Sequence, residues 1–174
     1  MKRTFLSIII AISGLDMTAQ KTPCTTDATY RQFDFWIGEW EVYGKNGKKA
    51  GDSKIDLILD SCIILENWKS ANLVNGVYYA GKSFNAYNSV TKQWQQTWVD
   101  NVGGTIEFLE GHYETDKMVF KTKPFPLNKD TMAIRRLTFF NLGKDKVRQY
   151  SELSKDDNKT WTPEYDLEYR RKKM

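Results

Sequence analysis

Phe33-Asp34-Phe35-Trp36-Ile37-Gly38-Glu39-Trp40 is the stretch that best indicates the fold of this chain of 174 residues. Four of its eight residues are aromatic, and short segments rich in aromatic and β-branched residues follow it towards the C-terminus. Such segments are typical of β-strands. We therefore expect this stretch to open a folded β-domain.

The segments after this opening have the length and composition of β-strands, and turn residues separate them. Asn46-Gly47 and Asn75-Gly76 are typical of tight turns, and residues 124–130 form the one long loop. No amphipathic helix lies between the segments, so an all-β, antiparallel up-and-down barrel of about ten strands is predicted. A closed barrel hides the edges of the sheet. Consecutive hairpins with few long crossovers favour it over a two-sheet sandwich. The expected strands are 36–43, 53–60, 62–69, 77–87, 93–100, 105–110, 117–123, 132–141, 146–154 and 161–170.

The first twenty residues lack the strand pattern. Lys2 and Arg3 are followed by an almost uninterrupted apolar run over residues 5–15 and by small or polar residues at 18–20. This order is typical of a secretory signal peptide, whereas a buried N-terminal helix would require an amphipathic pattern. We predict a signal peptide over residues 1–20, a single β-barrel domain over residues 21–174, and an exported protein, periplasmic or secreted.

Charge and hydropathy argue against two classes of partner. The formal net charge is +4, or +3 without residues 1–20, and much of it lies in the tail at 170–173. No basic stripe with interleaved aromatic residues occurs, so nucleic acid is not an expected partner. The apolar run at 5–15 is too short to span a bilayer comfortably, so an integral membrane protein is not expected.

Cysteine and histidine usage bears on cofactors. Cys24 and Cys62 could pair in an exported protein, and two unpaired buried thiols are the alternative. His112 is the only histidine, and the cysteines lack metal-ligand spacing, so no metal site is expected. The sequence has no phosphate loop, dinucleotide fingerprint or nucleophile elbow, so no cofactor and no catalytic residue is predicted.

Alternation within the strands indicates the candidate binding residues. Period two places Trp94, Gln96, Trp98 and Asp100 on one face, where a plain core would be aliphatic. Aromatic area combined with a few polar groups is what a ligand-binding wall needs. The same mixture recurs on other strands. The predicted ligand-binding residues are Glu66, Trp68, Ser83, Asn85, Tyr87, Gln96, Trp98, Asp100, Arg136, Arg148 and Glu152.

Each of these residues also has a purely structural interpretation. Tryptophans at alternate positions often pack in a core or plug the end of a barrel. Glu66 could pair with Arg136 or Arg148 across the interior, since buried charges persist only when they are partnered. Taken as a set, the aromatic and polar pattern favours a cavity.

Residues 154–161 form a second local signature. Ser154, Asp156, Thr160 and Trp161 have the spacing of the Asp-box hairpin of sialidase propeller blades, with Asn158 in place of glycine. Asparagine also reaches positive φ, and the aspartate of such turns accepts hydrogen bonds from its own backbone. The motif predicts a structured turn and gives no indication of glycosidase activity.

Taken together, these motifs show that the chain resembles a bacterial family of exported, lipocalin-like (calycin) proteins of unknown function. Gly38-Glu39-Trp40 has the Gly-x-Trp spacing found at the first strand of lipocalin-like barrels. The resemblance implies the barrel, export, and a late arginine, Arg170 or Arg171, packed over Trp40. It implies no activity, and Phe139 stands where a tryptophan is often found. The matching pieces are residues 33–40, 62–68, 83–88, 94–100, 136, 148–149, 154–161 and 169–171.

The leading hypothesis is an exported barrel that binds a small, partly apolar molecule in its interior. One rival is a cell-envelope interaction module that uses exposed strand faces or the loop at 121–130. The other is an enzyme in which Glu66 or Asp100 is a general acid or base, which requires a carboxylate whose pKa is raised by burial.

Overall fold

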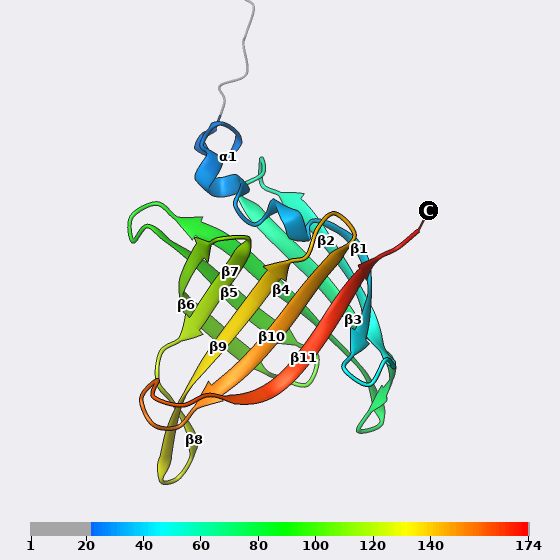
Figure 1. Cartoon of the computed structure of the whole chain (residues 1–174), viewed down its shortest axis with the longest axis vertical. Helices are drawn as coiled ribbons and strands as arrows, with labels where there is room; N and C mark the ends of the chain where they lie inside the picture. The colour runs from blue at the N-terminus through cyan, green and yellow to red at the C-terminus, as the bar shows by residue number, and fades with distance from the viewer. Residues whose placement is uncertain (1–21, 174) are drawn as a thin grey trace, which may run out of the picture.

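Ten antiparallel strands close into a barrel in the computed structural model, which describes residues 22–173 (Figure 1). Strand β11 pairs with β1 and β9 pairs with β10, so the sheet closes on itself. The predicted all-β, up-and-down barrel is confirmed. Its strands are β1 (Gly38–Gly44), β2 (Lys49–Ile58), β3 (Ile63–Val74), β4 (Val77–Asn88), β5 (Gln93–Asp100), β6 (Thr105–Glu114), β7 (Lys117–Thr122), β9 (Thr131–Asn141), β10 (Lys146–Ser154) and β11 (Thr162–Arg171).

Strands β2, β3 and β6 differ from the expected bounds by four or five residues at one end, and two segments differ from the expectation in kind. The loop predicted over 124–130 contains a short strand, β8 (Phe125–Asn128), which pairs with β9 and extends beyond the barrel. Trp36, expected in the first strand, instead ends a 3₁₀ turn, η2 (Asp34–Trp36), in which its N–H donates to the carbonyl of Phe33 (3.2 Å). Strand β1 begins only at Gly38, whose φ of 135° favours glycine.

The segment before the barrel lies across one of its ends (Figure 1). Besides η2 it holds two short helices, α1 (Pro23–Thr26) and η1 (Ala28–Arg31). None of the helices within residues 22–173 is long and apolar enough to cross a membrane. The predicted signal peptide, residues 1–20, lies outside the described residues.

Aromatic side chains close this end of the barrel. Phe33 and Trp36 are fully buried, and their stacked rings have centroids 5.1 Å apart. The ring centroid of Phe139 lies 5.0 Å from that of Phe33 and 4.5 Å from that of Trp36. On the barrel wall, the Trp94 ring lies 6.0 Å from Phe33 and the Tyr169 ring lies 5.9 Å from Trp36. We call these five residues the aromatic plug. Edge-to-face and stacked contacts of this kind stabilise the fold beyond the burial of apolar area.

An arginine near the C-terminus covers the first strand at the same end. The Arg171 guanidinium lies 4.2 Å from the centre of the Trp40 ring, and it donates to the carbonyls of Ile37 (3.2 Å) and Lys144 (2.8 Å). Arg170 instead lies over Tyr43 on the outer face. The arginine expected over Trp40 is therefore Arg171, and its cation–π contact joins the last strand to the first.

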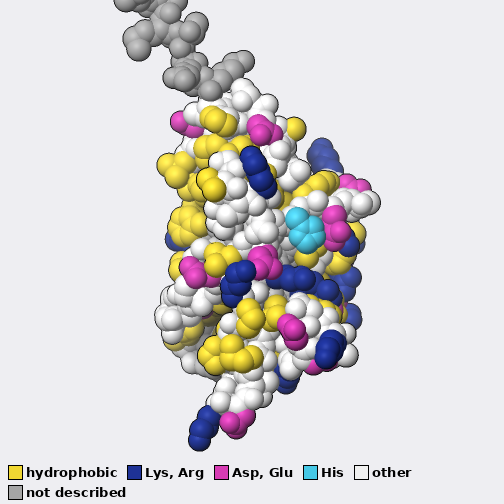
Figure 2. Space-filling model, turned by 90° about the vertical axis from the view of Figure 1, so that its left-hand side faces the viewer, with side chains coloured by type: hydrophobic (Ala, Val, Ile, Leu, Met, Phe, Trp, Pro, Cys, Tyr) yellow, Lys and Arg dark blue, Asp and Glu magenta, His cyan; other side chains and the backbone are white. Residues whose placement is uncertain are grey.

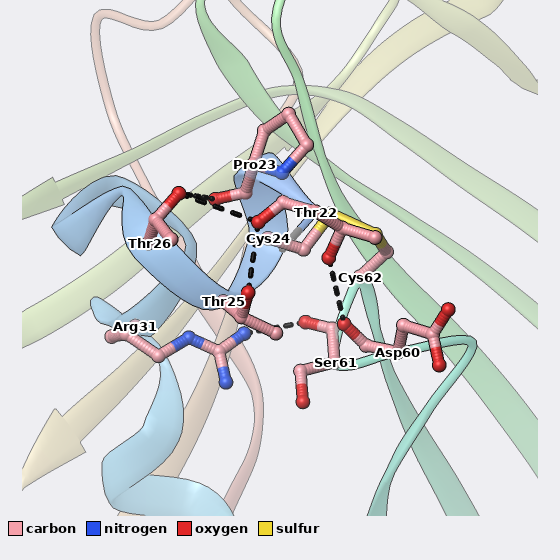
Figure 3. The surroundings of a disulfide bond; sticks show 9 residues. All are labelled: Thr22, Pro23, Cys24, Thr25, Thr26, Arg31, Asp60, Ser61 and Cys62. Atoms are coloured by element: carbon pink, nitrogen blue, oxygen red, sulfur yellow. Dashed lines mark hydrogen bonds between the residues drawn. A yellow bond between two sulfur atoms is a disulfide. The ribbon is translucent and has the colours of Figure 1, made fainter. Parts of the chain in front are cut away.

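A disulfide between Cys24 and Cys62 ties the N-terminal segment to the barrel (Figure 3). It links α1 to the turn between β2 and β3. Two hydrogen bonds repeat this connection: the Thr22 hydroxyl donates to the carbonyl of Asp60, and the Arg31 guanidinium donates to the carbonyl of Ser61. The segment that supplies Phe33 and Trp36 is thus fastened to the wall on its N-terminal side as well.

Candidate ligand-binding cavity

A cavity of about 680 Å³ occupies the barrel beyond the aromatic plug. Asn72 and Val74, which are exposed residues of β3, line part of it, so the cavity reaches solvent at the other end of the barrel. Its volume falls within the range of sites for small organic ligands. Other lining residues include Glu66, Trp68, Tyr79, Gln96, Trp98, Leu137, Gln149 and Tyr169.

Three aromatic side chains form one wall of this cavity. The Tyr79 ring lies between the indoles of Trp68 and Trp98, at centroid distances of 5.6 and 6.3 Å. The indole of Trp68 lies over Gly51 of the preceding strand, where an added Cβ atom would come within 2.8 Å of the ring. A Cβ atom at Gly81 would overlap the Trp98 ring in the same way. The two glycines thus let the indoles lie back against the wall, and the lumen stays open.

Asp100 holds this aromatic wall from behind and does not itself line the cavity. Its Oδ2 accepts from the Tyr79 hydroxyl (2.9 Å) and the Trp98 indole N–H (3.3 Å). Its Oδ1 accepts from the backbone N–H groups of Val102 (3.0 Å) and Gly104 (2.7 Å). Burial alone would raise the pKa of Asp100, but these hydrogen bonds outweigh it and lower the pKa. Asp100 is therefore an ionised positioning residue.

Glu66 is a buried carboxylate on the cavity wall, with only 2% of its surface exposed. Oε1 accepts from the hydroxyls of Ser53 (2.8 Å) and Tyr169 (3.2 Å), and Oε2 accepts from that of Ser83 (3.0 Å). No ion pair to Glu66 is found within residues 22–173. Burial raises its pKa to about 7, although the three hydroxyls act in the opposite direction.

A chain of buried amides supports this carboxylate. The Gln96 side-chain NH₂ donates to Asn85 Oδ1 (2.6 Å), and the Asn85 NH₂ donates to the Ser83 hydroxyl (3.0 Å) and the carbonyl of Ile64 (3.0 Å). Because Ser83 in turn donates to Glu66, hydrogen bonds run from Gln96 through Asn85 and Ser83 to the carboxylate. The network orients both Glu66 and Gln96, which line the cavity.

The predicted binding residues occupy four different places in the structure. Glu66, Trp68, Gln96 and Trp98 line the cavity, while Ser83, Asn85 and Asp100 lie behind them and hold them in place. Tyr87 lies towards the closed end, where its ring is 5.3 Å from Tyr30 and 6.0 Å from Trp94. The last group is Arg136, Arg148 and Glu152.

Arg136, Arg148 and Glu152 lie on the outer face of the barrel, so the prediction that they line the interior is wrong. Leu137 and Gln149 face the cavity, and their strand neighbours therefore point outward. Arg136 pairs with Glu152 (2.7 Å) and Arg148 with Asp166 (2.7 Å), so neither arginine is a partner of Glu66. Figure 2 shows part of this outer surface, where side chains of both charges lie near the histidine.

The Asp-box-like residues form the turn between β10 and β11. Asp156 Oδ1 accepts from the Ser154 hydroxyl (2.8 Å) and from the backbone N–H of Thr160 (2.9 Å). Hydrogen bonds from Thr160 are the main reason that the pKa of Asp156 falls to about 2. Trp161 lies outside the barrel, with the Arg136 guanidinium 4.1 Å from its ring centre. The motif shapes a turn, as predicted.

Several cavity residues were not predicted from the sequence. Tyr79 shares its face of β4 with Ser83 and Asn85, so the same period-two argument indicates it. Tyr169 and Gln149 are also at alternating positions, but their meeting with Glu66 requires closure of the barrel, because Tyr169 is 103 residues away from Glu66. No local pattern contains that information.

Glu66→Gln is expected to remove a pH-dependent loss of stability. The folded protein holds the Glu66 proton up to about pH 7, whereas the ordinary pKa is 4.5. Below pH 4.5 both states are protonated and burial has no electrostatic cost. As the pH rises from 4.5 to about 7, the free energy of unfolding falls by about 3 kcal/mol, because only the unfolded state releases the proton easily. Above about pH 7 this loss stays constant.

Urea unfolding of both proteins across this pH range measures the effect. The free energy of unfolding of Glu66→Gln minus that of the wild type should rise by about 3 kcal/mol between the acidic and the mildly alkaline limit. A difference that does not change with pH would contradict a raised pKa at Glu66.

No group of three or more His, Cys, Asp or Glu side chains in the described part of the chain is arranged to hold a metal ion. No protein-family model matches the chain, and no curated protein matches it. The fold and the chemistry of the cavity are therefore the observations from which a function is inferred.

Proposed function

We propose that this protein binds a small, partly apolar molecule inside its barrel. The observation that carries the proposal is the cavity of about 680 Å³, closed at one end by the aromatic plug and walled by Trp68, Tyr79 and Trp98. Apolar walls with a few well-oriented polar groups are the usual form of a small-molecule site. An envelope interaction module would have no need of such a lumen.

We further propose that the protein is exported and belongs to the lipocalin-like family that its motifs resemble. The signal-like residues 1–20 support export, and so does the Cys24–Cys62 disulfide, because disulfides persist in oxidising compartments. The contact of Arg171 with Trp40 in a closed antiparallel barrel supports the family.

Native mass spectrometry of the mature chain, purified from its own host, tests the binding function. A discrete additional mass that is released on denaturation is the expected result. Titration with N-phenyl-1-naphthylamine, a neutral apolar fluorophore, tests the cavity independently and should show saturable binding to one site. An apo mass together with no fluorophore binding would overturn the proposal.

Trp98→Ala is expected to weaken fluorophore binding by about tenfold, since stacking on one aromatic ring contributes about 1 kcal/mol or more. Its effect on the free energy of unfolding should be smaller than that of a fully buried tryptophan, because Trp98 faces the cavity. Trp94→Ala is the matched control: Trp94 lies on the same face of β5 but is only 2% exposed and belongs to the plug.

The two variants should therefore show opposite patterns. Trp94→Ala should lower the free energy of unfolding by about 3–5 kcal/mol and leave the affinity of the folded protein nearly unchanged. Equal losses of affinity and stability in Trp98→Ala would show that Trp98 is core and that the cavity wall is misassigned.

A second candidate function is acid–base catalysis on the bound molecule, and one observation favours it. Burial raises the pKa of Glu66 to about 7, where a carboxyl group can both donate and accept a proton near neutral pH. Asp100, the other carboxylate considered, has a lowered pKa and does not suit the role. Titration of the Glu66 carboxyl carbon by NMR tests this candidate, and an ordinary pKa would exclude it.

A further inference from the structure

The cations on the cavity wall have carboxylate partners, but one carboxyl group on the wall has no cationic partner within residues 22–173. This difference indicates the chemistry of the molecule proposed to bind there. Lys49 lines the cavity but its ammonium group pairs with Glu41 (2.9 Å) and Asp52 (3.0 Å). Arg135 also lines it and forms a two-point ion pair with Glu164 (2.6 and 2.7 Å). Both cations on the wall are thus already matched by carboxylates.

Glu66 has no such match in residues 22–173. Its neighbours Ser53, Ser83 and Tyr169 are neutral hydroxyls, and they supply hydrogen bonds but no positive charge. A buried carboxylate is stable in its ionised form only when a cation or many donors compensate for the lost hydration. The cavity wall therefore carries one carboxyl group for which residues 22–173 supply no counter-charge when it is ionised.

Glu66 also retains room for one more donor. A carboxylate accepts about four hydrogen bonds. Oε1 already accepts from Ser53 and Tyr169, whereas Oε2 accepts only from Ser83. The Tyr169 hydroxyl has a single proton, and Gln149 Oε1, at 3.0 Å, competes with Glu66 for it. An additional donor on the cavity side would complete the hydrogen bonding of the carboxylate.

The aromatic wall suits the same kind of donor. Trp68, Tyr79 and Trp98 line the lumen that leads to Glu66, and Asp100 accepts the polar hydrogens of Tyr79 and Trp98. Aromatic faces attract cations, most strongly where water is excluded. The wall thus provides apolar area that tolerates a positive charge.

We propose that the ligand of this cavity has a protonated amine at its inner end, paired with Glu66, and an apolar body that packs on Trp68, Tyr79 and Trp98. This inference rests on the proposed binding function and specifies its ligand class. Where Glu66 is ionised, a ligand with a carboxylate at its inner end is disfavoured, because two negative groups would then face each other in a site of low dielectric constant. Under that condition, fatty-acid-like molecules should bind more weakly than amines with the same apolar body.

A matched series of compounds tests the proposal: phenylbutylamine, phenylbutanol and phenylbutyric acid, which share one apolar body. Their affinities are measured at about pH 8, where the amine is protonated and Glu66 is mostly ionised, by displacement of N-phenyl-1-naphthylamine and by calorimetry. The amine should bind about 10- to 100-fold more tightly than the alcohol, as expected for a charge-assisted hydrogen bond, and the acid more weakly than both.

Glu66→Gln should bind the amine and the alcohol with similar affinity, while Glu152→Gln, on the outer face, should keep the preference of the wild type. The comparison of the three compounds on the wild type stands even if Glu66→Gln folds poorly. If the alcohol or the acid binds at least as well as the amine, this inference is overturned and the binding function stands. If none of the compounds and no fluorophore binds, the proposed function itself fails.

Discussion

Phe33→Ala is expected to lower the free energy of unfolding by about 3–5 kcal/mol, the usual cost of removing a fully buried phenyl ring from a rigid core. The Phe33 ring is completely buried and lies within 6.0 Å of the rings of Trp36, Trp94, Phe120 and Phe139. These partners come from the N-terminal segment and from three strands, so the surroundings cannot collapse easily into the space left behind. Urea unfolding followed by tryptophan fluorescence measures the change.

Phe84→Ala is the matched control for this variant. Phe84 has the same side chain, but it is 43% exposed and points outward from β4. We expect a loss of no more than about 1 kcal/mol there. If Phe33→Ala were no more destabilising than Phe84→Ala, the segment that crosses the end of the barrel would not unfold together with it.

The double substitution Cys24→Ser and Cys62→Ser is expected to cost about 4 kcal/mol of stability. The disulfide closes a loop over a sequence separation of 38 residues, and its loss lets the unfolded chain explore many more conformations. Replacing both cysteines avoids a free thiol, and thermal unfolding of the variant against the oxidised wild type measures the effect.

Reduction of the wild type with dithiothreitol provides an independent control, because it breaks the same bond without changing the sequence. Both treatments should lower the midpoint of unfolding by a similar amount. A double variant as stable as the oxidised protein would mean that the N-terminal segment stays in place through its apolar contacts and the hydrogen bonds of Thr22 and Arg31 alone.

Local sequence signals were sufficient for the fold. Asn75-Gly76 adopts the positive φ angles, 49° and 84°, that its composition indicates, and β5 and β10 have the predicted bounds. Such features depend on a few neighbouring residues. Trp36 was different: it follows the same aromatic pattern as Trp40 but lies in a 3₁₀ turn, because it closes the barrel instead of joining its wall.

The candidate site could be predicted only in part, because alternation does not say which of its two faces is inside. On β5 the tryptophans identified the inner face correctly for Trp98. On β9, Arg136 points outward, where Trp161 and Glu152 surround it, although its neighbour Leu137 lines the cavity. The partners of Glu66 on β2 and β4 come from the neighbouring hairpins, whereas Tyr169 on β11 reaches Glu66 only because the barrel closes.

The lumen exists because two positions in its wall, Gly51 and Gly81, have no side chain. Neither glycine has to touch a ligand. A larger residue at Gly81 would push the Trp98 indole inward and reduce the space available, whereas a Cβ atom at Gly51 would first meet the backbone carbonyl oxygen of Lys69. The width of the lumen can therefore be changed by a single substitution at Gly81, which meets the Trp98 side chain first and leaves the polar groups near Glu66 intact.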